Sequence, residues 1–154
     1  MKRNLKLAMV AALAITFALP VAAQTGKVYR DGSDWIEEIT GTLTGVRSLR
    51  VRTDAGSVNV QGGAQQGITY TIRKRVRGGS EESARRVLAA FRVTAGNRSG
   101  MAVLEGNAEG RMRNFSIDFK VNTPREIESV RAETDGGSIG VRNIAGHVTA
   151  QVRR

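Results

Sequence analysis

The strongest constraint on the fold is a stretch of sequence that occurs twice. Residues 48–60, SLRVRTDAGSVNV, align without a gap with residues 129–141, SVRAETDGGSIGV. With one small insertion allowed, residues 67–69 continue onto residues 147–149. Each copy has the pattern of a strand, an Asp-x-Gly-Ser turn, a second strand, a short break and a third strand. Units of this kind stack their apolar edges into one shared core, so the repeat predicts stacked short strands.

Alternation of apolar and polar residues extends beyond the repeat, and it has the period of a half-buried strand. The clearest case is residues 114–122, in which the apolar side chains share one face. Glycine is frequent, with 18 residues, whereas proline occurs only 2 times, which suits many tight turns between short strands. The same alternation occurs at Leu49/Val51, Val58/Val60, Ile68/Tyr70/Ile72, Ile139/Val141 and Val148/Ala150/Val152. We therefore predict an all-β body.

One segment has helical periodicity instead. Ser80 is suited to cap a helix, Glu81 and Glu82 suit the positive end of its dipole, and apolar residues follow at positions 84, 87, 88 and 91. An amphipathic helix of an exported protein could also lie on a membrane. Because its polar face mixes acids with arginines, we expect it to pack on the sheet and cover part of an edge or end.

The repeat motif, a Pro-led segment followed by S-[LV]-R-x-x-T-D-x-G-S-[VI]-x-V and a further strand, resembles the exported bacterial "putative adhesin" family, also called toast-rack domains. The resemblance covers most of residues 44–154 and is clearest at residues 125–150. It implies a right-handed β-solenoid-like stack of short strands, here with one amphipathic helix, located on or outside the envelope and with no established activity.

The sequence departs from the usual longer members of that family by stopping at Arg153-Arg154, where another repeat would follow. Either this is a short form or C-terminal coils are missing. Both cases leave an open strand edge that must be paired or blunted, so self-association through the open repeat ends is one expectation.

The first residues have the three-part pattern of a secretory signal peptide. Lys2, Arg3 and Lys6 precede an uncharged apolar run at residues 7–19, and small residues at positions 21–23 provide a cleavage site. The run is short for a membrane span, so an uncleaved anchor is the weaker alternative and no stable span is expected after cleavage. We divide the chain into a signal peptide (1–23), an N-terminal lead segment (24–43) and a β-repeat domain (44–154), and expect export to the periplasm or the cell surface.

The residue types that carry most enzyme chemistry are scarce. Cysteine is absent and His147 is the only histidine, so thiolate chemistry, a disulfide and a histidine-rich metal site are excluded. No residue marks His147 as a catalytic base. We expect no catalytic, cofactor-binding or metal-binding residues, no cofactor and no enzymatic activity. The alternative is an enzyme acting on envelope polysaccharide, which needs at least two carboxylates in a solenoid groove. The candidates for that groove are Asp118, Glu126, Glu128 and Glu133.

The formal charge of +10 favours an anionic partner. Arginines occupy outward positions of neighbouring predicted strands, where stacking would align them into a ladder, and guanidinium groups suit phosphate and carboxylate. The candidate contacts are Arg47, Arg50, Arg52, Arg73, Arg75 and Arg77, with Arg111 and Arg113 as an extension. With 1 Trp, 2 Tyr and 4 Phe there is no platform for stacking bases, so nucleic acid is not expected. The sequence thus predicts a non-enzymatic domain that contacts an anionic envelope polymer or an envelope protein.

Overall fold

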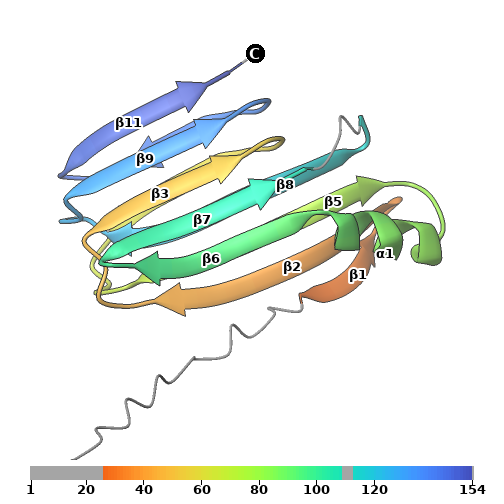
Figure 1. The fold of residues 1–154 in the computed structure, drawn as a ribbon, viewed down its shortest axis with the longest axis horizontal. Coiled ribbons are helices and arrows are strands. Elements are labelled where there is room, and N and C mark those ends of the chain that lie inside the picture. Colours follow the sequence, from red (N-terminus) through yellow and green to blue (C-terminus); the bar gives the residue numbers. More distant parts are fainter. Residues whose placement is uncertain (1–25, 109–112, 154) are drawn as a thin grey trace, which may run out of the picture.

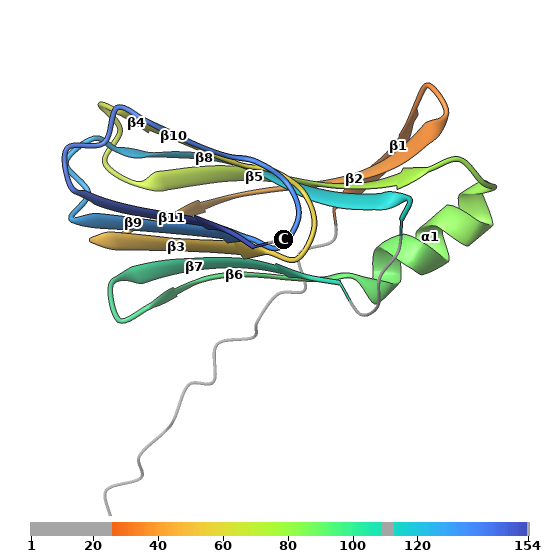
Figure 2. The same ribbon diagram turned by 90° about the horizontal axis from the view of Figure 1, so that it is seen from above.

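Two β-sheets lie face to face, and one helix sits at one end of the pair (Figures 1 and 2). The computed structural model describes residues 26–108 and 113–153, so the expected signal peptide and Arg111 lie outside the described residues. In these ranges no helix is long and apolar enough to cross a membrane. The elements are β1 (Lys27–Asp31), β2 (Asp34–Leu43), β3 (Ser48–Thr53), β4 (Val58–Gly63), β5 (Ile68–Arg77), α1 (Glu81–Ala90), β6 (Arg92–Arg98), β7 (Met101–Asn107), β8 (Phe115–Pro124), β9 (Ser129–Thr134), β10 (Ile139–Arg142) and β11 (His147–Val152).

The two copies of the repeat stack on each other in register, as their alignment predicts. β3 pairs in parallel with β9, with Ser48 opposite Ser129, and β4 pairs in parallel with β10, with Val58 opposite Ile139. In each copy the Asp-x-Gly-Ser turn carries the chain from one sheet to the other. The repeat is therefore a structural unit whose two strands belong to different layers of one sandwich.

The glycine of that turn is required by the stacking. Gly56 has a φ of +124°, a conformation that side chains rarely adopt, and a Cβ atom at this position would collide with the backbone carbonyl of Ile117. Gly137, the equivalent residue of the second copy, lies equally close to the backbone of Gly56. The turns of neighbouring strands thus pack backbone against backbone.

The two sheets are mixed, which corrects the expectation of a right-handed solenoid-like stack. Sheet A has the order β1-β2-β5-β8-β4-β10 and sheet B the order β11-β9-β3-β7-β6. Parallel neighbours join β10, β4 and β8 in sheet A, and β11, β9, β3 and β7 in sheet B. The remaining strands are antiparallel to their neighbours. A two-residue turn at Ser99 and Gly100, both with positive φ, returns β7 beside β6 in the same sheet, which a continuous coil does not do.

The core lies between the sheets and contains the apolar residues of the alternating pattern, including Leu49, Val58, Ile72 and Phe119. The lead segment takes part in it, since β1 and β2 extend sheet A beyond β5 and Ile39 of β2 is buried.

Helix α1 forms where the sequence predicts it and packs on the sheet. The Ser80 hydroxyl accepts a hydrogen bond from the Ser83 backbone N–H at 3.3 Å, which caps the helix. Ala84 and Leu88 are buried against Val76 of β5. Because α1 covers the inner face of sheet A beside β5 and β2, the helix closes one end of the sandwich (Figure 2).

Candidate functional site

The arginines singled out from the sequence do not form one ladder. Arg50 and Arg52 alternate with the buried residues of β3 and therefore point outward from sheet B. Arg73, Arg75 and Arg77 alternate in the same way on β5 and point outward from sheet A. The two sets lie on opposite broad faces of the sandwich. Arg47 precedes β3, its side chain is exposed, and its backbone N–H donates to the carbonyl of Gly100 at 2.7 Å.

On the outer face of sheet B the arginines of β3, and Arg131 of β9, lie next to carboxylates. Glu133, with a side chain only 6% exposed, lies 2.6 Å from Nη2 of Arg131 and 3.8 Å from Nη2 of Arg50. The hydrogen bond from Arg131, followed by the nearby positive charges, holds the pKa of Glu133 below its ordinary value. Arg52 lies 3.7 Å from Asp135. These contacts pair Arg50, Arg52 and Arg131 with acidic groups of the protein itself, which leaves less of their charge for a ligand.

Arg73, on the outer face of sheet A, is also held by the protein. Its Nη2 donates to the hydroxyl of Tyr29 at 2.9 Å, and its Nε lies 3.5 Å from Oε2 of Glu38. The Tyr29 contact is the main cause that raises the pKa of the Arg73 guanidinium above its ordinary value. Arg73 is therefore part of a local network that joins β1, β2 and β5.

Arg75 and Arg77 differ from the other predicted arginines because they meet a third arginine around a hollow. Together with Arg113 and Ser116 they line a depression of about 130 Å³ at the ends of β5 and β8. Among residues 26–108 and 113–153, no ion pair engages any of these three guanidinium groups. Three unneutralised cations around a small polar hollow form the strongest anion-binding geometry on this face.

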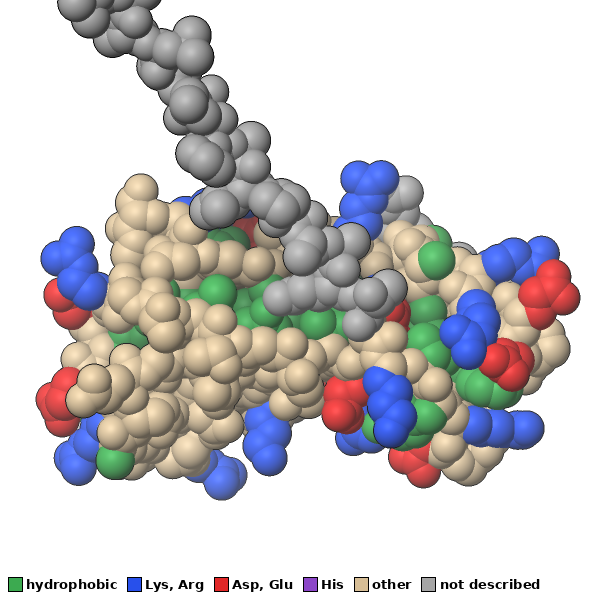
Figure 3. Space-filling view, turned by 90° about the horizontal axis from the view of Figure 1, so that it is seen from below, with side chains coloured by type: hydrophobic (Ala, Val, Ile, Leu, Met, Phe, Trp, Pro, Cys, Tyr) green, Lys and Arg blue, Asp and Glu red, His purple; other side chains and the backbone are tan. Residues whose placement is uncertain are grey.

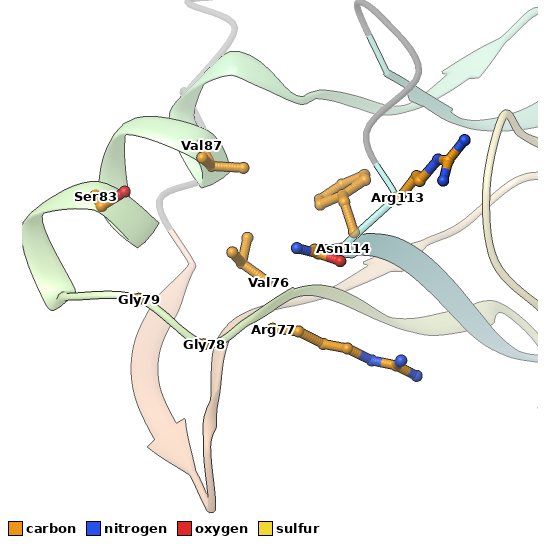
Figure 4. Close-up of a pocket in the computed structure, with 9 residues that line it drawn as sticks. Val76, Arg77, Gly78, Gly79, Ser83, Val87, Arg113 and Asn114 are labelled. Carbon is orange, nitrogen blue, oxygen red and sulfur yellow. The ribbon is translucent and has the colours of Figure 1, made fainter.

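A second, more apolar hollow adjoins the first one, between α1 and the ends of β5 and β8. It has a volume of about 310 Å³ and shares Arg77 and Arg113 with the arginine-lined depression. Figure 4 shows Val76 and Val87 pointing into this space, whereas the side chains of Arg77 and Arg113 extend away from it. The two arginines thus stand at the boundary between an apolar pocket and a cationic surface.

Two further cations extend the positive charge across the outer face of sheet A. Lys120 of β8 and Arg142 of β10 line a shallow hollow of about 380 Å³ together with the amide side chains of Asn59, Gln61 and Asn122. In the described part of the chain neither cation has a carboxylate partner. We call the outer face of sheet A that carries Arg75, Arg77, Arg113, Lys120 and Arg142 the cationic face.

Lys120 and Arg142 are the members of the cationic face that the sequence reasoning missed. The signal for Lys120 was available, because it alternates with the buried residues of β8 and so must face outward. The signal for Arg142 was the alignment of the two repeat copies, which places it beside Gln61 of the first copy, at an outward position. The sequence could not show which arginines lack a carboxylate partner, because this depends on pairings between strands that are distant in sequence.

The carboxylates considered for polysaccharide cleavage do not share a groove. Asp118 lies on the outer face of sheet A, where it accepts a hydrogen bond from the Ser57 backbone N–H at 2.8 Å, and Glu133 lies on the outer face of sheet B. Glu126 and Glu128 are in the connection between β8 and β9. The described residues contain no group of three or more His, Cys, Asp or Glu side chains that could hold a metal ion. His147 is exposed on the edge strand β11, with its Nε2 at 3.4 Å from the hydroxyl of Thr149.

Two solved bacterial structures are similar to part of this chain. No family model matches the chain, and no curated protein matches it. A crystal structure described as a "putative cell adhesion protein" from Clostridium sporogenes is similar, with a TM-score of 0.45 and 12% identity over 76% of this chain and 58% of that chain. A "putative adhesin" from Parabacteroides merdae has a TM-score of 0.38 and 11% identity over 75% of this chain and 43% of that chain. The chain thus spans about half the length of these two proteins, and it is similar to bacterial structures described as adhesins.

Proposed function

We propose that this protein is an exported, non-catalytic domain of the periplasm or cell surface that binds phosphate-bearing components of the envelope through its cationic face. The observation that carries the proposal is the meeting of Arg75, Arg77 and Arg113 around one hollow without a carboxylate partner in the described ranges. Planar guanidinium groups bind phosphate oxygens through paired, charge-assisted hydrogen bonds. The three guanidinium groups around one hollow are a reason to expect phosphate to bind at this place on the molecule. The net positive charge alone would give only a general attraction to anions.

The size of the hollow indicates the kind of ligand. Pockets for drug-sized molecules have volumes of about 300–1,000 Å³. The arginine-lined hollow, at about 130 Å³, suits a single phosphate or carboxylate group. Lys120 and Arg142, further along the same face, would contact neighbouring anionic groups of a polymer or a lipid surface. A ligand with repeated phosphates matches this distribution better than a small metabolite does.

Co-sedimentation of the purified exported chain with vesicles tests the proposal. We expect binding to vesicles that contain phosphatidylglycerol, weaker binding at high salt, and little binding to pure phosphatidylcholine. A variant with Arg75→Ser, Arg77→Ser and Arg113→Ser should bind roughly 100-fold more weakly, since each basic residue near an anionic surface contributes about 1 kcal/mol.

The control is the Arg50→Ser/Arg52→Ser variant, which removes two arginines that are paired with carboxylates on the opposite face. It should bind the vesicles as the unmodified chain does. An equal loss of affinity per removed charge in both variants would reduce the effect to net charge, and unchanged binding of the triple variant would overturn the assignment of the site. Binding to an acidic protein of the envelope, with none to the vesicles, would turn the proposal toward a protein partner.

A further inference from the structure

The apolar hollow beside the cationic face exists because α1 covers only part of the sheet on which it packs. The helix lies on β5 and β2, and its buried stripe contains Ala84 and Leu88. Val87, on the neighbouring side of the helix, is only partly buried and lines the hollow. Phe115, at the start of β8, is also partly buried and lines it. The hollow, which we call the apolar pocket, is therefore the space between α1 and the end of β8.

Hydrogen bonds fix the position of the helix and so keep the apolar pocket open. Gly78 and Gly79 connect β5 to α1 and line the pocket with their backbone. The N–H of Gly78 donates to the carbonyl of Ser33 at 3.1 Å, and Nε1–H of Trp35 donates to the carbonyl of Gly79 at 3.2 Å. The connection is thereby tied to the turn between β1 and β2 and to β2 itself, so the pocket is part of the folded structure.

The apolar pocket has an uncharged interior and a positively charged mouth. Val76 and Val87 point into it, whereas the side chains of Arg77 and Arg113 extend away from it (Figure 4). None of the described residues that line the pocket or the adjoining arginine-lined hollow is acidic. By contrast, basic and acidic side chains are mixed around the hydrophobic ones that Figure 3 shows at this end of the molecule. The mouth of the pocket thus favours an anionic group, and its interior an apolar one.

We propose that the apolar pocket binds the alkyl chain of a single-chain lipid phosphate, whose phosphate group lies among Arg75, Arg77 and Arg113. This inference deepens the proposed function and rests on the same arginines. A phosphate monoester carries about 1.5 to 2 negative charges at pH 7 and three acceptor oxygens, which match three guanidinium groups better than a carboxylate does. The pocket adds recognition of the chain to a surface that otherwise contacts only the phosphate.

The volume of the apolar pocket limits the length and the number of chains. About 310 Å³ is at the lower limit for pockets that bind small molecules. At about 30 Å³ for each water-sized group, roughly ten methylene groups fit. A second chain of similar length would remain outside. The affinity should therefore rise with chain length up to about ten carbons and then level off, because further methylene groups stay in water.

Isothermal titration calorimetry with hexyl, octyl, decyl and dodecyl phosphate, each below the concentration at which it forms micelles, tests the proposal. Up to decyl phosphate each added methylene should tighten binding roughly 3-fold, and dodecyl phosphate should bind about as decyl phosphate does. Decyl maltoside, which has no charge, should bind at least roughly 10-fold more weakly than decyl phosphate. An affinity that does not change with chain length, or that still rises beyond ten carbons, would overturn the assignment of the pocket. Equal binding of decanoate would overturn the choice of phosphate.

Two substitutions on α1 fill the apolar pocket and test its location. Val87→Trp replaces a side chain that points into the pocket, and Ser83→Trp adds an indole at an exposed lining position where the core is not disturbed. Each should weaken binding of decyl phosphate roughly 10-fold, with circular dichroism unchanged. The matched control is Ala89→Trp, at an exposed residue of the same helix that does not line the pocket. Unchanged affinity in both pocket variants, or an equal loss in the control, would refute the location.

Vesicle co-sedimentation of the same variants separates this inference from the proposed function. Val87→Trp and Ser83→Trp retain the arginines, so they should still bind vesicles that contain phosphatidylglycerol. Vesicle binding by the unmodified chain without binding of decyl phosphate would overturn the pocket and leave the proposed function intact. Binding of decyl phosphate without vesicle binding would overturn the proposed contact with a membrane surface and leave the pocket intact.

Discussion

Lys74 is expected to stabilise the fold through a buried ion pair, although in the sequence it lies in the middle of a basic run. Its side chain is 7% exposed, and its Nζ lies 2.8 Å from Oε2 of Glu37 and 3.1 Å from the carbonyl oxygen of Leu88 in α1. Removing one partner of a buried pair costs about 3–5 kcal/mol, because the other charge stays buried without compensation. Glu37 retains 14% exposure, which places the expected loss for Lys74→Ala near the lower limit, at about 3 kcal/mol.

Urea denaturation at neutral pH measures this loss. With a slope of about 2 kcal/mol per molar urea, the unfolding midpoint should fall by about 1.5 M in Lys74→Ala. The matched variant is Lys74→Met combined with Glu37→Leu, which removes both charges and keeps most of the volume. It should be nearly neutral, because two apolar groups replace a desolvated pair. A loss below about 1 kcal/mol in Lys74→Ala would be typical of exposed pairs and would refute the reasoning.

Three other predictions concern stability and are measured by the same unfolding experiment. The pKa of Glu133 is lowered in the folded state, so this residue stabilises the fold above pH 4.5, its ordinary pKa, and the contribution is lost as the pH falls toward the folded pKa. In Glu133→Gln, the free energy of unfolding should therefore decline less steeply with falling pH. A pH profile of stability unchanged by this substitution would contradict the role of Arg131. Gly56→Ala should lower the free energy of unfolding by at least about 2 kcal/mol, because it combines a positive φ with a collision against backbone. Gly32→Ala should cost only about 1 kcal/mol, because Gly32 has a φ of +61° and open space around it. Equal losses would show that the stacked turns tolerate a side chain. Ser80→Ala should cost about 1 kcal/mol through loss of the helix cap, and Ser80→Thr should retain most of it.

Much of the fold was accessible from the sequence. The gap-free alignment of the two repeat copies is realised as in-register pairing of β3 with β9 and of β4 with β10. The helix and its cap at Ser80 were also predictable, because caps and amphipathic periodicity are local. What the alternation could not reveal is which sheet a strand joins. The antiparallel strands β5 and β6 look like any other half-buried strand in sequence, and the lead segment gave no sign that it forms β1 and β2 of sheet A.

The candidate site was likewise only partly predictable from the sequence. The sequence by itself determined that arginines at alternating positions of β3 and β5 point outward, because alternation with buried residues follows from strand geometry. Only the tertiary structure decided that the two sets lie on opposite faces, that Glu133 and Asp135 pair with the arginines of β3, and that Arg113 joins Arg75 and Arg77 around a hollow. The physical reason is that alternation is a property of a single strand, whereas neutralisation of a charge depends on strands brought together from distant parts of the chain.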